Sequence, residues 1–587
     1  ADIPGAEEST FKPAGAQLGA TLRVIVTAHN AAGEASSVSK ASKVVAANGE
    51  CTITWTGLSG WAAWNVAANW NLNRVPGPGD AVCITGSELE SPILYQEGRT
   101  QIDRLLDSRP IVISGGELDL EDGKATSKVR ELFLTGGVVG GSGVLELEGE
   151  TTWSHGGWTG AGATTLPAGS LLTLTGEGTI GDGHSLSIGG RLNIQPSTRL
   201  GLEGSAQISN SGVIDIQGNT QILQFQQQQP ITTRILNSGT FEQTGGGNSY
   251  VQPLFDNFGH VTGSAGSLIF LSSNSSGASD SGSYATSGSE SSISFYGGRT
   301  LGSTASLTGT VDWQGGEVSG TLPAGSLLTL TGEGTIGDGH SLSIGGVIAT
   351  QPSTRLRMEP QAELILQPGA AFKAGSILEV TSGASLRADG TVNQPVTFTS
   401  WKDDSVLGDT NHDGTDSTPG PGDWPGISIS SARNVSLSHL DLRYAETAIS
   451  VQLLDSMSIT ESDFVYNNAA ISVAGTTDND PVLGALACVP PYLSFINASR
   501  DWFGATGLPA PDIDLLSVIG AVIPDEYGSA FGAASTLAHA DYKLFGADNT
   551  IPFSIYSCPE LGIPPIPVTP VLVGETPASP LYPDPEA

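Results

Sequence analysis

The segment DTNHDGTDSTPGPGD, which begins at Asp409, holds the side chains best suited to binding a cation. Asp409, Asn411 and Asp413 place an oxygen ligand at every second residue, and Gly414 follows them. Calcium loops use this spacing because alternate oxygens converge on one ion and glycine permits the sharp turn. The first half of the segment therefore predicts a calcium site.

The second half of the segment departs from that pattern. Gly420 stands where a bidentate glutamate would complete the ligand set, so Asp416 or Asp423 would have to replace it. A solvated acidic loop without an ion is the alternative interpretation. Calcium is the one cofactor that the sequence suggests.

Asp441 and Asp463 form the best candidate pair for catalysis, with Arg443, Tyr444 and Tyr466 beside them. Polysaccharide lyases and hydrolases need carboxylates grouped with a base or paired at a defined separation. Stacked aspartates at the corner of a repeat are more often structural. We therefore expect no enzymatic activity, and a polysaccharide lyase or glycoside hydrolase is the alternative.

The chain has 10 tryptophans although only 6% of its residues are aromatic. Trp153, Trp158 and Trp313 lie in glycine-rich segments just before a duplicated block. Exposed tryptophans on a flat sheet stack on sugar rings or on partner proteins. These three are candidates for contact with a carbohydrate or protein partner, and burial in the core is the alternative.

The composition favours strands over helices. The 587 residues include 78 glycines but only 14% charged residues, which suits many short strands joined by tight turns. A net charge of −35 repels nucleic acid and anionic lipid, and no apolar run is long enough to span a membrane. We expect an all-β protein with neither nucleic-acid binding nor membrane insertion.

The four cysteines lie in two distant regions without the spacing of a zinc site. We expect local disulfides, Cys51 with Cys83 and Cys488 with Cys558, in a secreted protein. The other connectivities and free buried thiols are alternatives. A chain that begins at Ala1 is expected to be a processed product or a fragment.

A duplicated block indicates how the strands are arranged. TLPAGSLLTLTGEGTIGDGHSLSIGG occupies Thr165–Gly190 and returns unchanged at Thr321–Gly346, and QPSTRL extends the matched segments to 165–200 and 321–356. Each copy is expected to form one turn of a coil. The identity includes Glu177, Asp182 and His184, which we expect to be exposed. Recent duplication explains it, and selection for two equivalent binding sites is the alternative.

A second repeat sets the register of that coil. Ile427, Ile449 and Ile471 recur at equal intervals, each within an apolar-polar-apolar triplet. The same step aligns further pairs: Leu437 with Ile459, Asp441 with Asp463, Leu442 with Phe464, and Tyr444 with Tyr466. Repeats of this length with strand periodicity predict stacked parallel strands, about 20 turns of a parallel β-helix.

Polar-x-Gly corners support the same fold in the middle of the chain. They occur at Asn210/Gly212, Asn237/Gly239, Asn257/Gly259 and Asp280/Gly282. We expect glycine there because the corner needs a positive φ, and we expect the polar residue to shape the corner rather than to bind a ligand.

Three motifs resemble those of secreted bacterial proteins with a right-handed, pectate-lyase-like parallel β-helix. The first is TWTGLSGWAAWNVAANWNLNRVPGPGDAVCI, which resembles a first-turn motif, and the second is the loop before Ile427. The third, INASRDWFGATGLP, is similar to the ending of such coils, although Asp501, Trp502 and Phe503 depart from it. The resemblance implies the fold and an extracellular location, but it does not imply an activity.

The two ends of the chain are expected to differ from the coil. The N-terminal segment is similar to the last two strands of bacterial immunoglobulin-like repeats, with TAHNAAGEAS as their hairpin. The expected parts are residues 1–50 as partial immunoglobulin-like strands, 51–509 as the β-helix, 510–558 as a cap and 559–587 as a Pro-rich tail. Because neither end is self-sufficient, we expect a structural or adhesive surface protein that forms a fibre by strand exchange or binds a surface glycan or protein.

Overall fold

The computed structural model describes residues 21–30, 33–42, 51–85, 91–123, 125–181, 183–225, 231–381, 383–452, 456–474 and 495–499. Cys488, Cys558, the expected cap and the Pro-rich tail lie outside these residues. The fold is all-β, with 53% strand and 1% helix, and it forms a parallel β-solenoid of about 17 turns. The predicted fold class is confirmed, and the expected number of turns was slightly too high.

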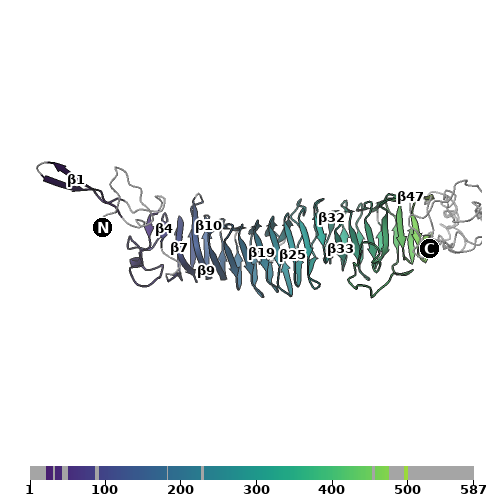
Figure 1. Ribbon diagram of the computed structural model, residues 1–587, viewed down its shortest axis with the longest axis horizontal. Helices are drawn as coiled ribbons and strands as arrows, with labels where there is room; N and C mark the ends of the chain where they lie inside the picture. Colours follow the sequence, from purple (N-terminus) through teal and green to yellow (C-terminus); the bar gives the residue numbers. More distant parts are fainter. Residues whose placement is uncertain are drawn as a thin grey trace, which may run out of the picture. The chain divides into compact units, whose positions relative to one another are not determined.

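The chain divides into two compact units, Ala1–Leu268 and Ile269–Ala587. Within each unit the strands of successive turns stack side by side in parallel rows (Figure 1). Among the described residues there is one short 3-10 helix, η3 (Ala67–Asn69). The rows follow from the alternating sequence, because every second side chain of a strand points inward.

The first unit begins with short and long strands that pair in parallel in several rows, and the longer strands take part in more than one row. These are β3 (Ile53–Thr54), β4 (Ala81–Ile84), β5 (Ile93–Tyr95), β6 (Arg99–Ile102), β7 (Arg104–Ile113), β8 (Glu117–Leu120), β9 (Thr126–Gly141), β10 (Val144–Leu147) and β11 (Glu150–Trp158).

Three regular rows follow in the first unit. The first row is β12 (Ala163–Leu166), β15 (Ser185–Ile188), β18 (Gln207–Asn210), β21 (Arg234–Asn237) and β24 (Leu254–Asn257). The second is β13 (Leu171–Leu174), β16 (Arg191–Ile194), β19 (Val213–Ile216), β22 (Thr240–Gln243) and β25 (His260–Gly263). The third is β14 (Glu177–Ile180), β17 (Arg199–Leu202), β20 (Gln221–Gln224) and β23 (Asn248–Val251).

The second unit has three rows of its own. The first is β29 (Arg299–Leu301), β32 (Val318–Leu322), β35 (Ser341–Ile344), β38 (Glu363–Leu366), β41 (Ser385–Asp389), β44 (Asn434–Ser438), β47 (Ser456–Thr460) and β50 (Phe495–Ser499). The second is β28 (Ser292–Phe295), β31 (Val311–Trp313), β33 (Leu327–Leu330), β36 (Val347–Thr350), β39 (Ala371–Ala374), β42 (Val396–Ser400), β45 (Leu440–Arg443) and β48 (Asp463–Val465). The third is β34 (Glu333–Ile336), β37 (Arg355–Met358), β40 (Leu378–Val380), β43 (Ile427–Ser430), β46 (Thr447–Gln452) and β49 (Ala469–Ala474).

The register predicted from the second repeat is confirmed. Ile427 pairs with Ile449, which pairs with Ile471, along β43, β46 and β49. The side chains of Ile427 and Ile449 are fully buried. The other aligned pairs are also neighbours, since Leu437 pairs with Ile459, Asp441 with Asp463 and Leu442 with Phe464. Each copy of the duplicated block forms one turn, β13–β14–β15 and β33–β34–β35.

The polar corners of the first unit form a ladder of buried amides. The Asn210 Nδ2 donates to the Asn237 Oδ1 at 2.7 Å, and the Asn237 Nδ2 donates to the Asn257 Oδ1 at 2.9 Å. The expected positive φ at the glycines beside them is wrong. The described glycines with positive φ do not include Gly212 or Gly239. Glycine is needed there because an added Cβ would lie 2.1–2.2 Å from a carbonyl oxygen of the preceding turn.

The N-terminal segment forms the predicted hairpin. Strand β1 (Ile25–Asn30) pairs antiparallel with β2 (Gly33–Val38), and every residue of both strands is exposed. The hairpin has no covering layer among the residues that the structure describes. A two-stranded hairpin of this kind is marginally stable in water by itself.

The first turn of the solenoid carries the expected disulfide, which joins Cys51 to Cys83. Asn69 is buried, and its amide organises the preceding loop by accepting from the Ser59 N–H and donating to the Trp61 carbonyl. No helix in the described part of the chain is long and apolar enough to cross a membrane.

Candidate functional site

A long connection between β42 and β43, residues 401–424, carries the predicted cation ligands, and we call it the strap. Figure 1 shows it as the extended loop beside the green strands. Three contacts anchor it to the solenoid wall. The Thr399 hydroxyl donates to the buried Asp403 carboxylate at 2.6 Å, the Ser400 hydroxyl donates to Asp423 at 3.1 Å, and the Trp424 indole donates to the Arg443 carbonyl at 2.7 Å.

Lys373 lies beneath the strap and serves as an internal cation. It stands on β39 at an outward position, yet its side chain is fully buried. Its ammonium group donates to the carbonyls of Val406 at 3.2 Å and Gly408 at 2.7 Å. Burial lowers the pKa of Lys373, and the charges of the nearby strap aspartates oppose that shift. Two hydrogen bonds from a buried ammonium group to backbone carbonyls therefore hold the strap against the solenoid.

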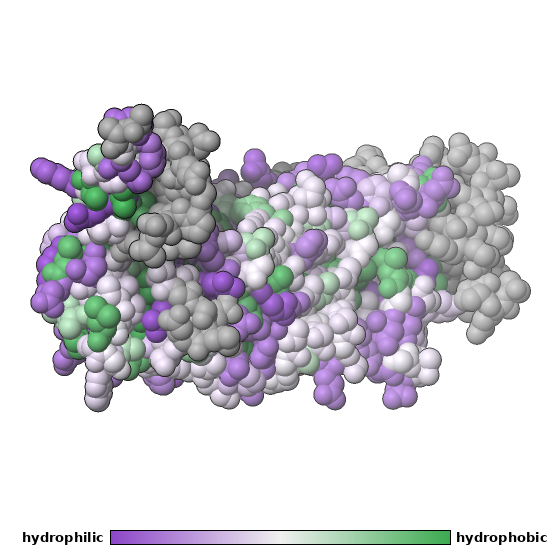
Figure 2. All heavy atoms as spheres, turned by 60° about the vertical axis from the view of Figure 1, so that its left-hand side comes forward, coloured by the Kyte–Doolittle hydropathy of each residue, from purple (hydrophilic) through white to green (hydrophobic). Residues whose placement is uncertain are grey.

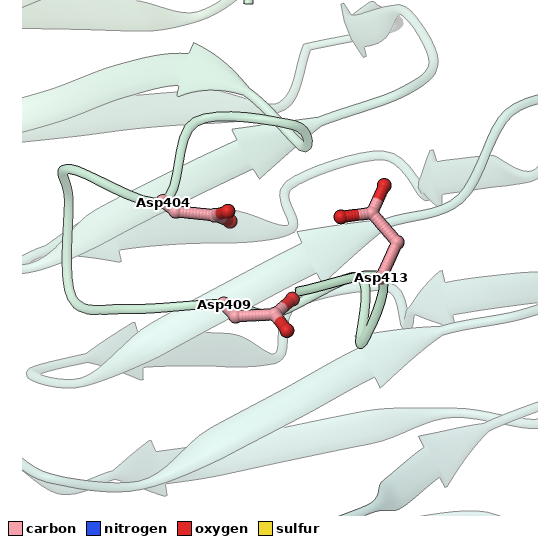
Figure 3. Close-up of side chains that lie close together, drawn as sticks. All are labelled: Asp404, Asp409 and Asp413. Atoms are coloured by element: carbon pink, nitrogen blue, oxygen red, sulfur yellow. The ribbon is translucent and has the colours of Figure 1, made fainter. Parts of the chain in front are cut away.

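Three strap carboxylates converge above this lysine. Ligand oxygens of Asp404, Asp409 and Asp413 all lie within 4.8 Å of one another. Figure 3 shows the three side chains close together. Burial, followed by the charge of Asp409, raises the pKa of Asp404. One oxygen each of Asp404 and Asp413 is buried without a hydrogen-bond partner. A hard cation with oxygen ligands would relieve the repulsion and satisfy both oxygens.

The structure brings only part of the predicted ligand set together. Asp409 and Asp413 meet as expected, but the third carboxylate is Asp404. Asn411 lies beside them, and its side-chain Nδ2 donates to Asp413 at 2.9 Å. Asp423 is engaged elsewhere, in an ion pair with Lys402 at 2.8 Å.

Asp416 is exposed and does not belong to the carboxylate cluster. Spacing within the segment could not reveal Asp404, because this residue precedes the alternating pattern and is brought back by the turn of the strap. The acidic pair Asp403 and Asp404, separated from that pattern by four residues, was the available signal.

Calcium binding to the strap stays a prediction, and it can be measured by melting. We expect the protein to melt at a higher temperature in calcium than in EDTA, because a ligand that binds only the folded state stabilises it by about 2.7 kcal/mol at a concentration of about 100 times its Kd. Asp409→Asn should abolish the shift, whereas the matched variant Asp416→Asn should keep it. Equal melting temperatures in calcium and in EDTA would leave only a solvated acidic loop.

The candidate catalytic pair is buried beside the strap. Asp441 and Asp463 are 1% and 4% exposed, and they stand one turn apart as predicted. The Arg443 guanidinium donates to both carboxylate oxygens of Asp441, with a distance of 2.7 Å from Nε to Oδ1. Burial raises the pKa of Asp441, which this ion pair partly opposes. The two rings of Tyr444 and Tyr466 stack in parallel at 5.6 Å. This arrangement fits a structural role.

The candidate tryptophans are buried, which is the alternative to contact with a partner. Trp153, Trp158 and Trp313 are at most 1% exposed. The glycines of the duplicated block make room for two of them. A Cβ on Gly178 would lie 2.3 Å from the Trp153 ring, and a Cβ on Gly334 would lie 2.6 Å from the Trp313 ring. These indoles fill the core and cannot stack on a ligand.

The two copies of the duplicated block present different surfaces despite their identical sequence. His184 is 3% exposed, contrary to expectation, and its Nε2 lies 3.0 Å from the Thr164 hydroxyl. The equivalent His340 is exposed and pairs with Glu317. The residue before the second copy is Gly320, which has no hydroxyl to hold the ring. The neighbours of the block decide where its histidine lies, so the copies are not two equivalent sites.

This difference predicts an acid-sensitive step in the first unit. Burial lowers the pKa of His184 to about 4. In the unfolded chain the histidine has a pKa near about 6.5, so below that pH the unfolded state binds a proton that the folded state does not. The fold is therefore most stable above about pH 6.5 and loses stability as the pH falls towards 4. The unsubstituted protein should therefore lose about 2 kcal/mol of its free energy of unfolding between pH 8 and pH 5, and His184→Gln should not show this loss. Urea unfolding at both pH values measures this, with His340→Gln as the matched control. An equal pH dependence in His184→Gln and the unsubstituted protein would contradict it.

Comparisons with protein-family models, with curated proteins and with solved structures gave no match to this chain. Its function is therefore inferred from its own residues.

Proposed function

We propose that this chain is an extracellular structural protein that assembles with copies of itself through strand exchange at its N-terminal hairpin. The observation that carries the proposal is the exposed hairpin β1–β2, which no described residue covers, in a chain whose described solenoid turns have a buried apolar core. Val24, Ile25, Val26 and Val38 of this segment are 54–64% exposed. Adding a strand from a second copy would bury these side chains and pair the free edges.

The packed interior supports a structural role. Aliphatic side chains fill most turns of the solenoid, and aromatic rings fill others, for example in the edge-to-face pair of Trp153 and Trp158 at 4.3 Å and that of Phe241 and Phe255 at 5.1 Å. On the face drawn in Figure 2, hydrophobic side chains form small separate patches among hydrophilic ones. The solenoid is thus stabilised from within.

The disulfide supports an extracellular location, and the charge supports contact between copies through the hairpin. A bond such as Cys51–Cys83 forms and persists in oxidising compartments. The net charge of −35 keeps solenoid walls of neighbouring copies apart, which favours contact through the nearly uncharged hairpin strands. Polysaccharide cleavage is the alternative function, and the burial of Asp441 and Asp463 speaks against a site at those residues.

Sedimentation velocity tests the proposal. The intact chain should sediment as oligomers whose size grows with concentration, and a chain without residues 1–45 should sediment as a folded monomer. Val26→Lys should also weaken assembly, because it places a charge on a strand that is to be buried. Leu407→Lys is the matched control, since Leu407 on the strap is 60% exposed and Val26 is 63% exposed. If the intact chain stays monomeric at every concentration, self-assembly is wrong.

A further inference from the structure

A shallow groove crosses successive corners of the first unit, far along the chain from the strap. Its volume is about 370 Å³, and seven residues line it: Ser187, Ser209, Asn210, Ser211, Leu236, Ser238 and Phe258. This volume is near the lower end of small-ligand sites, which run from roughly 300 to 1,000 Å³. None of the seven residues is charged, although the chain carries a net charge of −35.

The groove is built from two rows of side chains that repeat with the turns. Ser187, Ser209 and Leu236 are register neighbours on the outer face of β15, β18 and β21. Ser211 and Ser238 occupy the equivalent corner position in two successive turns. Successive turns are about 4.8 Å apart, so the hydroxyls form a ladder along the groove. A ligand with its own repeating hydroxyl groups matches such a ladder.

Phe258 takes the corner position where the two preceding turns have serine. Its side chain is 47% exposed, and it borders the groove. The backbone beneath it is fixed, because the Asn257 amide oxygen accepts from the Gly259 N–H at 3.2 Å and also belongs to the buried amide ladder. An exposed ring on a rigid corner presents a flat face at little entropic cost.

The serine hydroxyls of the groove keep hydrogen-bonding capacity in addition to the bonds that they make within the protein. Ser238 donates to the Asn210 carbonyl at 2.9 Å and Ser211 donates to the Ile188 carbonyl at 3.2 Å, which leaves their oxygens as acceptors. Ser209 accepts from the Gln207 amide at 3.1 Å and keeps its proton to donate. The groove thus offers both acceptors and a donor beside an aromatic face.

We propose that this groove binds a neutral oligosaccharide, with one sugar ring stacked on Phe258 and its hydroxyl groups paired with the serines. The absence of charged residues from the lining excludes the ion pairs that an anionic or cationic ligand needs. The next outward residue in the row, Asp256, is buried and paired with Arg234 at 2.6 Å, so its charge is neutralised.

The duplicated block provides an internal comparison. Ser343 is the equivalent of Ser187, but its register neighbour in the next turn is Ile365 instead of a serine. The Gln367 amide donates to the Ser343 hydroxyl at 2.7 Å. The block supplies only Ser187 to the groove, and the serine that follows it in the next turn has no counterpart after Ser343. This binding site does not depend on self-assembly of the chain.

Calorimetry on the full chain tests the proposal with three neutral hexasaccharides, cellohexaose, xylohexaose and mannohexaose, and with an anionic galacturonate oligomer. At least one neutral probe should bind, and Phe258→Ala should weaken it by about threefold to tenfold. The matched control is Tyr296→Ala, because Tyr296 is 48% exposed and outside the groove.

Ser238→Trp should fill the groove and abolish binding, whereas Ser343→Trp in the second copy should leave binding unchanged. The proposal is overturned if no neutral probe binds, if only the galacturonate oligomer binds, or if Phe258→Ala binds as well as the unsubstituted chain. Sedimentation of each variant shows separately whether self-assembly is kept.

Discussion

Replacing Asp280 with alanine is expected to lower the free energy of unfolding by about 3–5 kcal/mol. Asp280 and Arg299 are both fully buried, and their charged groups lie 3.9 Å apart. The Asp280 carboxylate also accepts hydrogen bonds at 2.7 Å from the Asn274 amide and from the Tyr284 hydroxyl. The variant would leave the guanidinium inside the solenoid without its carboxylate.

The surroundings of Arg299 explain why water cannot replace the lost partner. The guanidinium lies over the rings of Phe270 and Phe295, 5.0 Å and 5.2 Å from their centroids, and donates to the Ser272 carbonyl at 3.2 Å. These contacts stabilise the cation only in part, because neither rings nor one carbonyl neutralise a full charge in a medium of low polarity.

A double substitution separates the ion pair from simple packing. Asp280→Ala with Arg299→Met should recover part of the lost stability, because it removes the buried charge and keeps an apolar side chain of similar length. Urea unfolding of the two single variants and the double variant measures the coupling. Strictly additive losses in the double variant, or a loss below about 1 kcal/mol in Asp280→Ala, would show that the pair is not coupled.

Asn237→Ala is expected to cost about 2–5 kcal/mol, because it interrupts the amide ladder at its middle. The Asn210 amide would lose one acceptor, and the Asn257 carbonyl oxygen would lose the donor at 2.9 Å. The Asn237 amide also donates to the His260 carbonyl at 3.2 Å, so a backbone acceptor of the next turn would lose a bond as well. The Asn210 amide keeps its bond to the Thr240 carbonyl and the Asn257 side-chain oxygen keeps the Gly259 N–H, so the cost comes from three lost hydrogen bonds of about 0.5–1.5 kcal/mol each.

Ser211→Ala is the matched control for the ladder. Ser211 lies at the corner beside Asn210, but it is exposed and makes one side-chain bond, to the Ile188 carbonyl. It should cost less than about 1 kcal/mol. Equal unfolding curves for Asn237→Ala and Ser211→Ala would mean that the buried amides do not stabilise the corner.

The register of the solenoid could be predicted from sequence because it depends on local alternation. Ile427, Ile449 and Ile471 share a position in consecutive turns, and only parallel stacking buries such residues together. The corner asparagines were recognised for the same reason. The role of the corner glycines was not, because a close approach between turns leaves no mark within a single turn.

The candidate site was only partly predictable, because its residues meet through long-range folding. Lys373 lies on a strand well before the strap, and nothing near it in sequence indicates that carbonyls of residues 406 and 408 will cover it. The burial of Trp153 depends on Gly178 in the following turn. A glycine one turn after a tryptophan was the signal that could have assigned these indoles to the core.

Electron microscopy of the purified intact chain at high concentration tests self-assembly most directly. Strand exchange through the hairpin predicts end-to-end strings of particles, which should be absent from a preparation of the chain without residues 1–45. Separate particles in both preparations, at concentrations where contacts are frequent, would contradict a self-assembling structural protein.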